Sequence, residues 1–318
     1  MNKLLATASA IACVLTGAVA GAQDYPSRTI EVITHAGTGG GTDVTARMMM
    51  LGASKELGTD MVVVNKAGGG GAVAMDYMLT LPADGYSILT FTIGHAAEIA
   101  KGRTKMTLED IRPIARATDD PQILMVKCGA YESAEAFVAA QKEAPISYGT
   151  THLGNIDDVS AFMFTVKGDM QIPKIVPFEG GAELATQLIA GAVDSAVLNL
   201  GEARSQIDAG EICPIVVLAD ERMAGLPDVA TAKELGVPVS FSTVRGFVVP
   251  AGTPDDIAAK LEAALMTAME QDYYKEFLTS IGLDASSVAG ADVWGEQITT
   301  MTTDMETALT ELGFIQKK

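Results

Sequence analysis

The chain is poor in the residues that most often build metal sites, catalytic centres and aromatic cages. Its 318 residues include 3 histidines, 3 cysteines and 1 tryptophan. The histidines and cysteines are scattered without the spacing of a metal motif, so we expect no metal and no cofactor. The sequence also lacks a G-x-S-x-G elbow, an H-E-x-x-H pair and a cysteine beside a plausible base. These absences argue against an enzyme, and the scarcity of aromatic residues argues against a site for quaternary amines.

Basic residues are scarce as well, with 22 lysines and arginines against 40 aspartates and glutamates, and the formal net charge is −18. This charge argues against nucleic acid or an anionic membrane surface as a partner. Beyond residue 22 no stretch is long and apolar enough to cross a membrane. The length exceeds what one hydrophobic core usually organises, so we expect two lobes.

The N-terminus has the features of an export signal. Lys3 precedes an apolar run over residues 4–19, and three small residues (AGA) follow at 20–22. The run is shorter than the roughly 20 apolar residues that span a bilayer. We therefore interpret residues 1–22 as a cleaved signal peptide and expect a periplasmic protein.

Export bears on the two cysteines that follow the signal. Cys128 and Cys213 would lie in an oxidising compartment, where a single disulfide between them can form. Two isolated buried thiols are an equally good interpretation, because free cysteine packs as a small apolar residue. The sequence leaves this choice open.

Short aliphatic runs alternate with helical periods after residue 23. In the first part the strands are expected at 30–34, 61–65 and 87–91, and the helices at 43–57 and 72–79. This βαβαβ order predicts a parallel sheet. A second series of the same kind extends from residue 123 to residue 219 and predicts another α/β lobe.

Two interruptions separate these series. Residues 119–121 (DDP) lie between them, and residues 240–245 precede a last strand at 246–250. The remaining tail is mostly helical and is expected to pack on the first lobe. We predict lobe 1 over residues 23–120 and 244–318, lobe 2 over residues 121–243, and a ligand-binding cleft between them that is hinged by two crossover strands.

A glycine loop, GTGGGTD at residues 37–43, stands between the first strand and the first helix. Glycines allow close backbone approach, and the free amides of a helix N-terminus favour a carboxylate or phosphate. Thr42 replaces the third glycine of a dinucleotide motif, and no Gly-Lys-Ser/Thr follows to make a P-loop. A tight turn without a ligand is the alternative. We expect Asp43 to complement the helix dipole and not to contact the ligand.

The second lobe has a matching loop, YGTTHLGN at residues 148–155, between a strand and a helix. Thr150, Thr151 and Asn155 supply short polar side chains. His152 is open to three interpretations, which are a ligand donor, a loop hydrogen-bond partner and an exposed residue. A third glycine cluster at 68–71 is either a turn or a wall of the cleft.

The ordered series of motifs resembles the substrate-binding proteins of tripartite tricarboxylate transporters, also called Bug receptors, over nearly the whole chain after residue 22. The matching segments are YPSR at 25–28 ahead of Ile30, GGGTD at 39–43 with Ala46 and Arg47, NKAGGGG at 65–71, ADGY at 83–86, YGT at 148–150, GGA at 180–182, GAVD at 191–194 and PAGTP at 250–254. The resemblance implies a type II periplasmic binding-protein fold that holds a carboxylate between one loop of each lobe. It also implies delivery of the ligand to membrane permease subunits, and we expect the receptor to be a monomer.

The sequence departs from the family pattern around the expected site. His35 and Ala36 stand where proline and phenylalanine are usual, His152 replaces a glycine, and Asn155 and Asp158 replace serine and histidine. Arg245 stands where an aromatic residue is common, and it either binds a distal carboxylate or forms an ordinary surface salt bridge. The residues expected to bind the ligand are His35, Ala36, Gly37, Thr38, Gly39, Gly40, Gly41, Thr42, Gly94, Tyr148, Gly149, Thr150, Thr151, His152, Asn155, Phe178, Asn199 and Arg245.

The predicted function is therefore a receptor that captures a small organic acid and feeds a secondary transporter. A receptor for a sensor kinase or an ATP-driven importer is the alternative, and the sequence does not separate the two.

Overall fold

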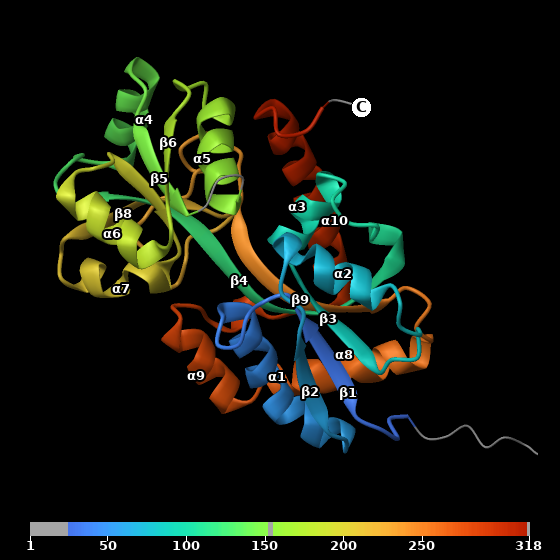
Figure 1. Ribbon diagram of the computed structural model, residues 1–318. Helices are drawn as coiled ribbons and strands as arrows, with labels where there is room; N and C mark the ends of the chain where they lie inside the picture. Colours follow the sequence, from blue (N-terminus) through green and yellow to red (C-terminus); the bar gives the residue numbers. More distant parts are fainter. Residues whose placement is uncertain (1–24, 152–154, 317–318) are drawn as a thin grey trace, which may run out of the picture.

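The computed structural model describes residues 25–151 and 155–316. The predicted signal peptide and His152 lie outside the described residues. The described chain forms an α/β fold with two bodies, and two long strands connect them (Figure 1). None of its helices combines the length and the apolar character that a bilayer crossing requires.

The first body begins with alternating strands and helices, close to the predicted ranges. They are β1 (Ile30–Thr34), α1 (Gly41–Leu57), β2 (Met61–Asn65), α2 (Ala72–Met78), β3 (Ser87–Thr92) and α3 (Ile93–Ala100). Strand β1 pairs in parallel with both β2 and β3, which confirms the βαβαβ prediction. Helix α3 was not predicted, because it begins directly after β3 and its first apolar residue continues the apolar run of the strand.

The second body repeats this alternation. Its elements are α4 (Ala134–Glu143), β5 (Ser147–Thr151), α5 (Ile156–Lys167), β6 (Lys174–Phe178), α6 (Gly181–Ala190), β7 (Ser195–Leu198), α7 (Leu200–Asp208) and β8 (Ile212–Leu218). Strand β5 is parallel to β6 and β7. Helix α7 was also missed, since it is short and has few apolar residues.

Strands β4 (Ile111–Lys127) and β9 (Ser242–Pro250) join the two bodies. Up to Pro121, β4 pairs with β9 in the first body, and from Gln122 onward it pairs with β7 and β8 in the second. Both predicted interruptions thus fall on these crossover strands, which run antiparallel to their neighbours. The lobe boundaries at residues 120/121 and 243/244 stay a prediction.

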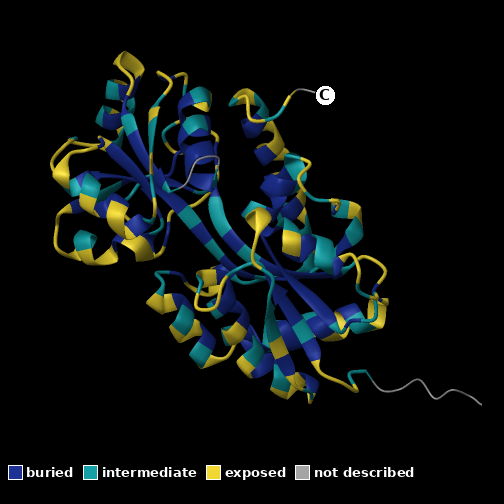
Figure 2. Cartoon of the chain, in the orientation of Figure 1, coloured by how far each residue is buried: buried dark blue, intermediate teal, exposed yellow. Residues whose placement is uncertain are grey.

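The C-terminal part adds helices α8 (Asp255–Met269), α9 (Asp272–Ser280) and α10 (Ala291–Glu311) to the first body. Short pieces complete the chain: the 3₁₀ turns Gly69–Gly71, Leu108–Asp110 and Ala285–Ser287, and β10 (Ala289–Gly290). Two apolar clusters form the core, one containing α2, α3, α4, α5 and α10 and the other α1, α6, α7, α8 and α9. The strands between them are the most deeply buried parts of the molecule (Figure 2). Each sheet is therefore covered by helices on both faces.

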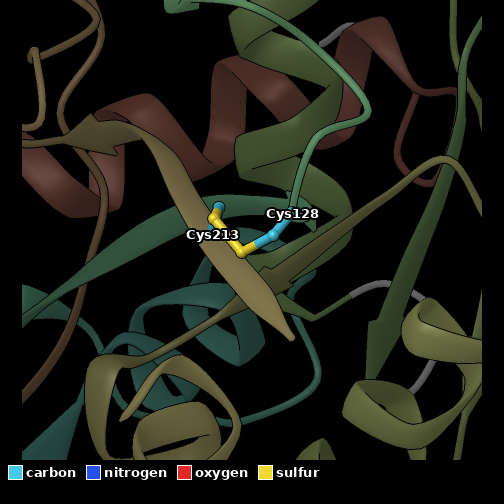
Figure 3. Close-up of a disulfide and its surroundings, with 2 residues drawn as sticks. All are labelled: Cys128 and Cys213. Carbon is cyan, nitrogen blue, oxygen red and sulfur yellow. A yellow bond between two sulfur atoms is a disulfide. The ribbon is translucent and has the colours of Figure 1, made fainter. Parts of the chain in front are cut away.

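Cys128 and Cys213 form a disulfide, with their Cα atoms 4.9 Å apart (Figure 3). Cys213 lies on β8 opposite the end of β4, and the backbone of Cys128 bonds to Glu211 next to it. The disulfide fastens the far end of β4 within the second body. The structure thereby decides between the two interpretations that the sequence left open.

Candidate ligand-binding site

The loop between β1 and α1 presents the N-terminus of α1 without a side-chain cap. Gly40 is the N-cap residue, and no side chain bonds to the first turn from that position. The carboxylate of Asp43 accepts from the backbone of Gly39 at 2.9 Å and from Arg47, whose hydrogen bond lowers the pKa of Asp43 to about 2. Asn65 donates to the same carboxylate, so Asp43 holds the loop in place through hydrogen bonds. The amides at the start of α1 remain available for an anion.

Arg245 on β9 lies against this helix end. A Cβ atom built on Gly41 would be 3.1 Å from Nη2 of Arg245, so the guanidinium lies directly against the start of α1. The Nε atom of Arg245 is buried without a hydrogen-bond partner, and its guanidinium forms no ion pair within 4 Å to a described residue. Arg245 thus adds positive charge to the uncapped N-terminus of α1.

Two carboxyl groups lie near Arg245, one on the crossover strand β4 and one on the second body. Asp120 on β4 is 7% exposed, and its Oδ1 atom has no hydrogen-bond partner among the residues that the structure describes. Burial raises the pKa of Asp120 to about 7, although the positive charge of Arg245 opposes this shift. Burial also raises the pKa of Glu202, at the start of α7, and the charge of Arg245 again opposes the shift.

Two histidines lie on the other side of the glycine loop. The rings of His35 and His95 meet edge to face with their centroids 4.4 Å apart. Burial and, to a smaller extent, the nearby charge of Arg245 lower the pKa of His35 to about 4. His95 is fully buried, its Nδ1 bonds to the start of α3, and burial lowers its pKa well below the usual value. Both rings are therefore neutral at physiological pH.

A cavity of about 300 Å³ opens beside these rings and draws on both bodies. Three predicted site residues line it: His35 and Gly94 from the first body and Asn155 from the second. The glycine cluster at 68–71 also forms part of its wall, and a Cβ atom at Gly70 would come within 2.9 Å of Glu98. The cluster thus forms a 3₁₀ turn and also borders the cavity, so both interpretations of it describe part of the structure.

Comparison with known proteins identifies the family of this chain. The profile of the "Tripartite tricarboxylate transporter family receptor" matches residues 45–300. The chain belongs to this family. It is 30% identical to a protein of the UPF0065 group from Bordetella pertussis over 301 residues, covering 92% of each chain.

Solved structures of the family have the same fold. A TctC solute-binding protein from Polaromonas, solved without ligand, is 28% identical with a TM-score of 0.85, covering 90% of this chain and 99% of that one. MatC from Rhodopseudomonas palustris, solved with bound malate, is 25% identical with a TM-score of 0.68, covering 90% of this chain and 100% of that one. Members of the family are periplasmic substrate-binding receptors and not enzymes, which confirms the prediction that this chain is no enzyme.

Four of the predicted site residues lie in the second body on strand β5. The side chain of Tyr148 is fully buried and donates to Gln141, and a Cβ atom at Gly149 would collide with Leu184. The side chain of Tyr148 therefore packs in the core, and no side chain larger than hydrogen fits at Gly149, so a ligand contact by either residue stays a prediction. Thr151 bonds through its amide and hydroxyl to Asp157 in the first turn of α5. Thr150 is fully buried with an unpaired hydroxyl.

Other predicted residues have structural partners. Asn199 caps α7 and donates to the carbonyls of Asp120 and Pro121 at 2.9 and 3.1 Å, so it fastens the second body to β4. Phe178 packs on the core beside Gly149. The remaining predicted residues, Ala36, Gly37, Thr38, Gly39, Gly40 and Thr42, all lie in or next to the uncapped loop before α1.

The structure adds groups that the sequence did not single out. Thr118 lies directly opposite Arg245 on the paired strand, and Asp120 is two residues further along β4. Opposed residues of antiparallel strands, and residues two apart, share one face of a sheet, so Thr118, Asp120 and Arg245 face the same side. The alternation of polar residues at 118 and 120 within the predicted crossover was the available signal.

A larger hollow of about 1000 Å³ lies on the other face of the crossover, where Asp119 and Val244 point. It is not lined by any residue of the loop before α1. The smaller cavity is the better candidate, because His35 on its wall is close enough to Arg245 for the arginine charge to lower the pKa of the histidine.

Proposed function

We propose that this receptor captures a small carboxylate between its two bodies and delivers it, as a monomer, to the permease of a tripartite tricarboxylate-type transporter. The observation that carries the proposal is the position of Arg245 against Gly41, at the uncapped N-terminus of α1. A guanidinium and helix amides converge on one point, and both bind carboxylates through charge-assisted hydrogen bonds. The related MatC binds malate, which supports the same ligand class here.

Ligand capture is tested with protein that has been unfolded and refolded to remove any bound molecule. Thermal unfolding is followed with mono-, di- and tricarboxylates, aromatic acids and amino acids, with sugars and amines that lack a carboxylate as controls. A ligand at one hundred times its dissociation constant stabilises the folded state by about 2.7 kcal/mol, a shift of several degrees. Stabilisation by sugars or bare amines alone would contradict the proposal.

The role of Arg245 is tested by Arg245→Gln, which removes the charge and keeps a polar side chain. A hydrogen bond to a charged group contributes about 1.5–3 kcal/mol, so the dissociation constant should rise by at least about tenfold. Arg204→Gln is the matched control, because Arg204 is exposed and pairs only with Asp208 in the described structure, at 3.1 Å. Equal increases in the dissociation constant for both variants would show that Arg245 does not contact the ligand.

Delivery is tested in cells of the source organism. Deleting the receptor gene should abolish uptake of the radiolabelled ligand, and the intact gene should restore it. Uptake that persists without the receptor, or that depends on an ATP-driven importer, would contradict the assignment to a secondary transporter.

A further inference from the structure

The face of the crossover strands that looks into the site carries two opposite charges that do not pair with each other. Arg245 lies opposite Thr118, and Asp120 follows two residues later on the same face of β4. Such diagonal neighbours have Cβ atoms about 7 Å apart, within reach of long side chains. Even so, no ion pair within 4 Å joins Arg245 to Asp120.

Each member of this pair keeps an unsatisfied atom. The Nε atom of Arg245, the Oδ1 atom of Asp120 and the hydroxyl of Thr118 between them are all buried without a hydrogen-bond partner in the described structure. Buried polar atoms normally have partners, and those of charged groups are the most costly to leave unpaired. A ligand that offers a hydrogen-bond acceptor to Arg245 and a donor to Asp120 would satisfy these atoms.

The charged groups around the site are also separated by sign. Positive charge lies on the side of the first body, where Arg245 meets the N-terminus of α1. Acidic groups lie on the side of the second body, where Glu202 is close enough to act on both Asp120 and Asp157. A ligand with carboxylates at both ends would satisfy Arg245 but would bring its second charge toward these acids.

We propose that the ligand is an α-amino acid or a similar zwitterion, with its carboxylate at Arg245 and the start of α1 and its ammonium group at Asp120. This inference rests on the proposed function, because it assigns the ligand class of the same site. It goes further in requiring a cationic group beside the carboxylate. A carboxylate that lacks this group would leave the Oδ1 atom of Asp120 unpaired.

The decisive experiment compares each amino acid with its deaminated analogue by isothermal titration calorimetry on the refolded protein at pH 8. The pairs include aspartate with succinate, glutamate with glutarate and alanine with propionate, after a thermal screen of the twenty amino acids. For the amino acid that binds, the analogue should bind at least about tenfold more weakly, as expected for the loss of a charged hydrogen bond. Amines that lack a carboxylate should not bind.

Asp120→Asn tests the assigned contact. In this variant the dissociation constant of the amino acid should rise by about tenfold or more. The dissociation constant of the deaminated analogue should stay the same or fall. Asp208→Asn, on the exposed outer part of α7, is the matched control and should change neither dissociation constant.

The pH dependence of the unmodified protein gives an independent result. Arg245, Glu202 and Asp119 surround Asp120, whose pKa of about 7 means that it loses its charge between pH 8 and pH 6. Affinity for the amino acid should fall over this interval, and affinity for a deaminated carboxylate should rise. This comparison decides the question even if Asp120→Asn does not fold.

The outcomes separate the two proposals. If deaminated carboxylates bind as tightly as the amino acids, or more tightly, at pH 8, the zwitterion inference is wrong and the receptor function stands. If neither amino acids nor other carboxylates bind, both are wrong.

Discussion

Asp120 should destabilise the ligand-free protein at neutral and high pH, and Asp120→Asn should relieve this effect. Its carboxyl group is 7% exposed, and burial raises its pKa from 3.8 to about 7. A carboxyl group whose pKa is raised on folding favours the folded state when it is protonated. Its contribution to stability is therefore greatest below pH 3.8 and decreases as the pH rises to about 7.

The size of the effect follows from the two pKa values. Each pKa unit corresponds to about 1.4 kcal/mol, so full ionisation of Asp120 costs about 4 kcal/mol. Between pH 5 and pH 8 the folded protein loses about 2.5 kcal/mol of this total. Asparagine cannot ionise, so the gain in stability from Asp120→Asn should be larger at pH 8 than at pH 5 by about that amount.

The assay is thermal unfolding of the refolded, ligand-free protein at the two pH values. For a chain of this size the difference between the two gains should be about 5 °C or more. Taking the difference between the gains at the two pH values cancels the contributions of the other titrating groups. As a control, Asp208→Asn replaces an exposed carboxylate and should change stability by less than about 0.5 kcal/mol at either pH. The same gain at both pH values, or a larger one at pH 5, would refute the burial argument for Asp120.

Two further predictions concern packing and the disulfide. Replacing both Cys128 and Cys213 by serine opens a loop of 85 residues and should lower the free energy of unfolding by about 4–5 kcal/mol. The midpoint of thermal unfolding should then fall, and an unchanged midpoint would contradict this prediction. Gly52→Ala should destabilise by about 1–3 kcal/mol despite the better helix propensity of alanine, since its Cβ atom would be 2.8 Å from that of Ala268 on α8. Gly37→Ala, whose Cβ atom meets nothing within 4 Å, is the control for denaturant unfolding.

The elements of the fold were largely predictable from the sequence. The aliphatic runs at 30–34, 61–65 and 87–91 became strands at nearly the same residues, and the glycine loop before α1 fell where the motif placed it. These features depend on residues close in the sequence, such as apolar periodicity and glycine at turns. Helix α3 was missed because it follows β3 without a break, and α7 was missed because it is short and has few apolar residues.

The site was predictable only in part. The loop motifs indicated where a carboxylate could bind, but they did not show that Tyr148 faces the core or that Asp120 faces the site. Side-chain direction on a strand alternates with every residue, so a motif alone does not tell which of its side chains point to the ligand. The packing of α6 on β5 and the register of β4 against β9 decide this.

By itself, the sequence determined the family, the alternation of the strands with most of the helices, and the glycine loop at the start of α1, because each depends on short contiguous patterns. Only the tertiary structure decided that Cys128 bonds to Cys213, that Arg245 lies against Gly41 and that Asp120 is buried near that arginine without pairing with it. Those relations arise from the pairing of strands that are distant in the chain. They place opposite charges on one face of the crossover, and no local pattern encodes that placement.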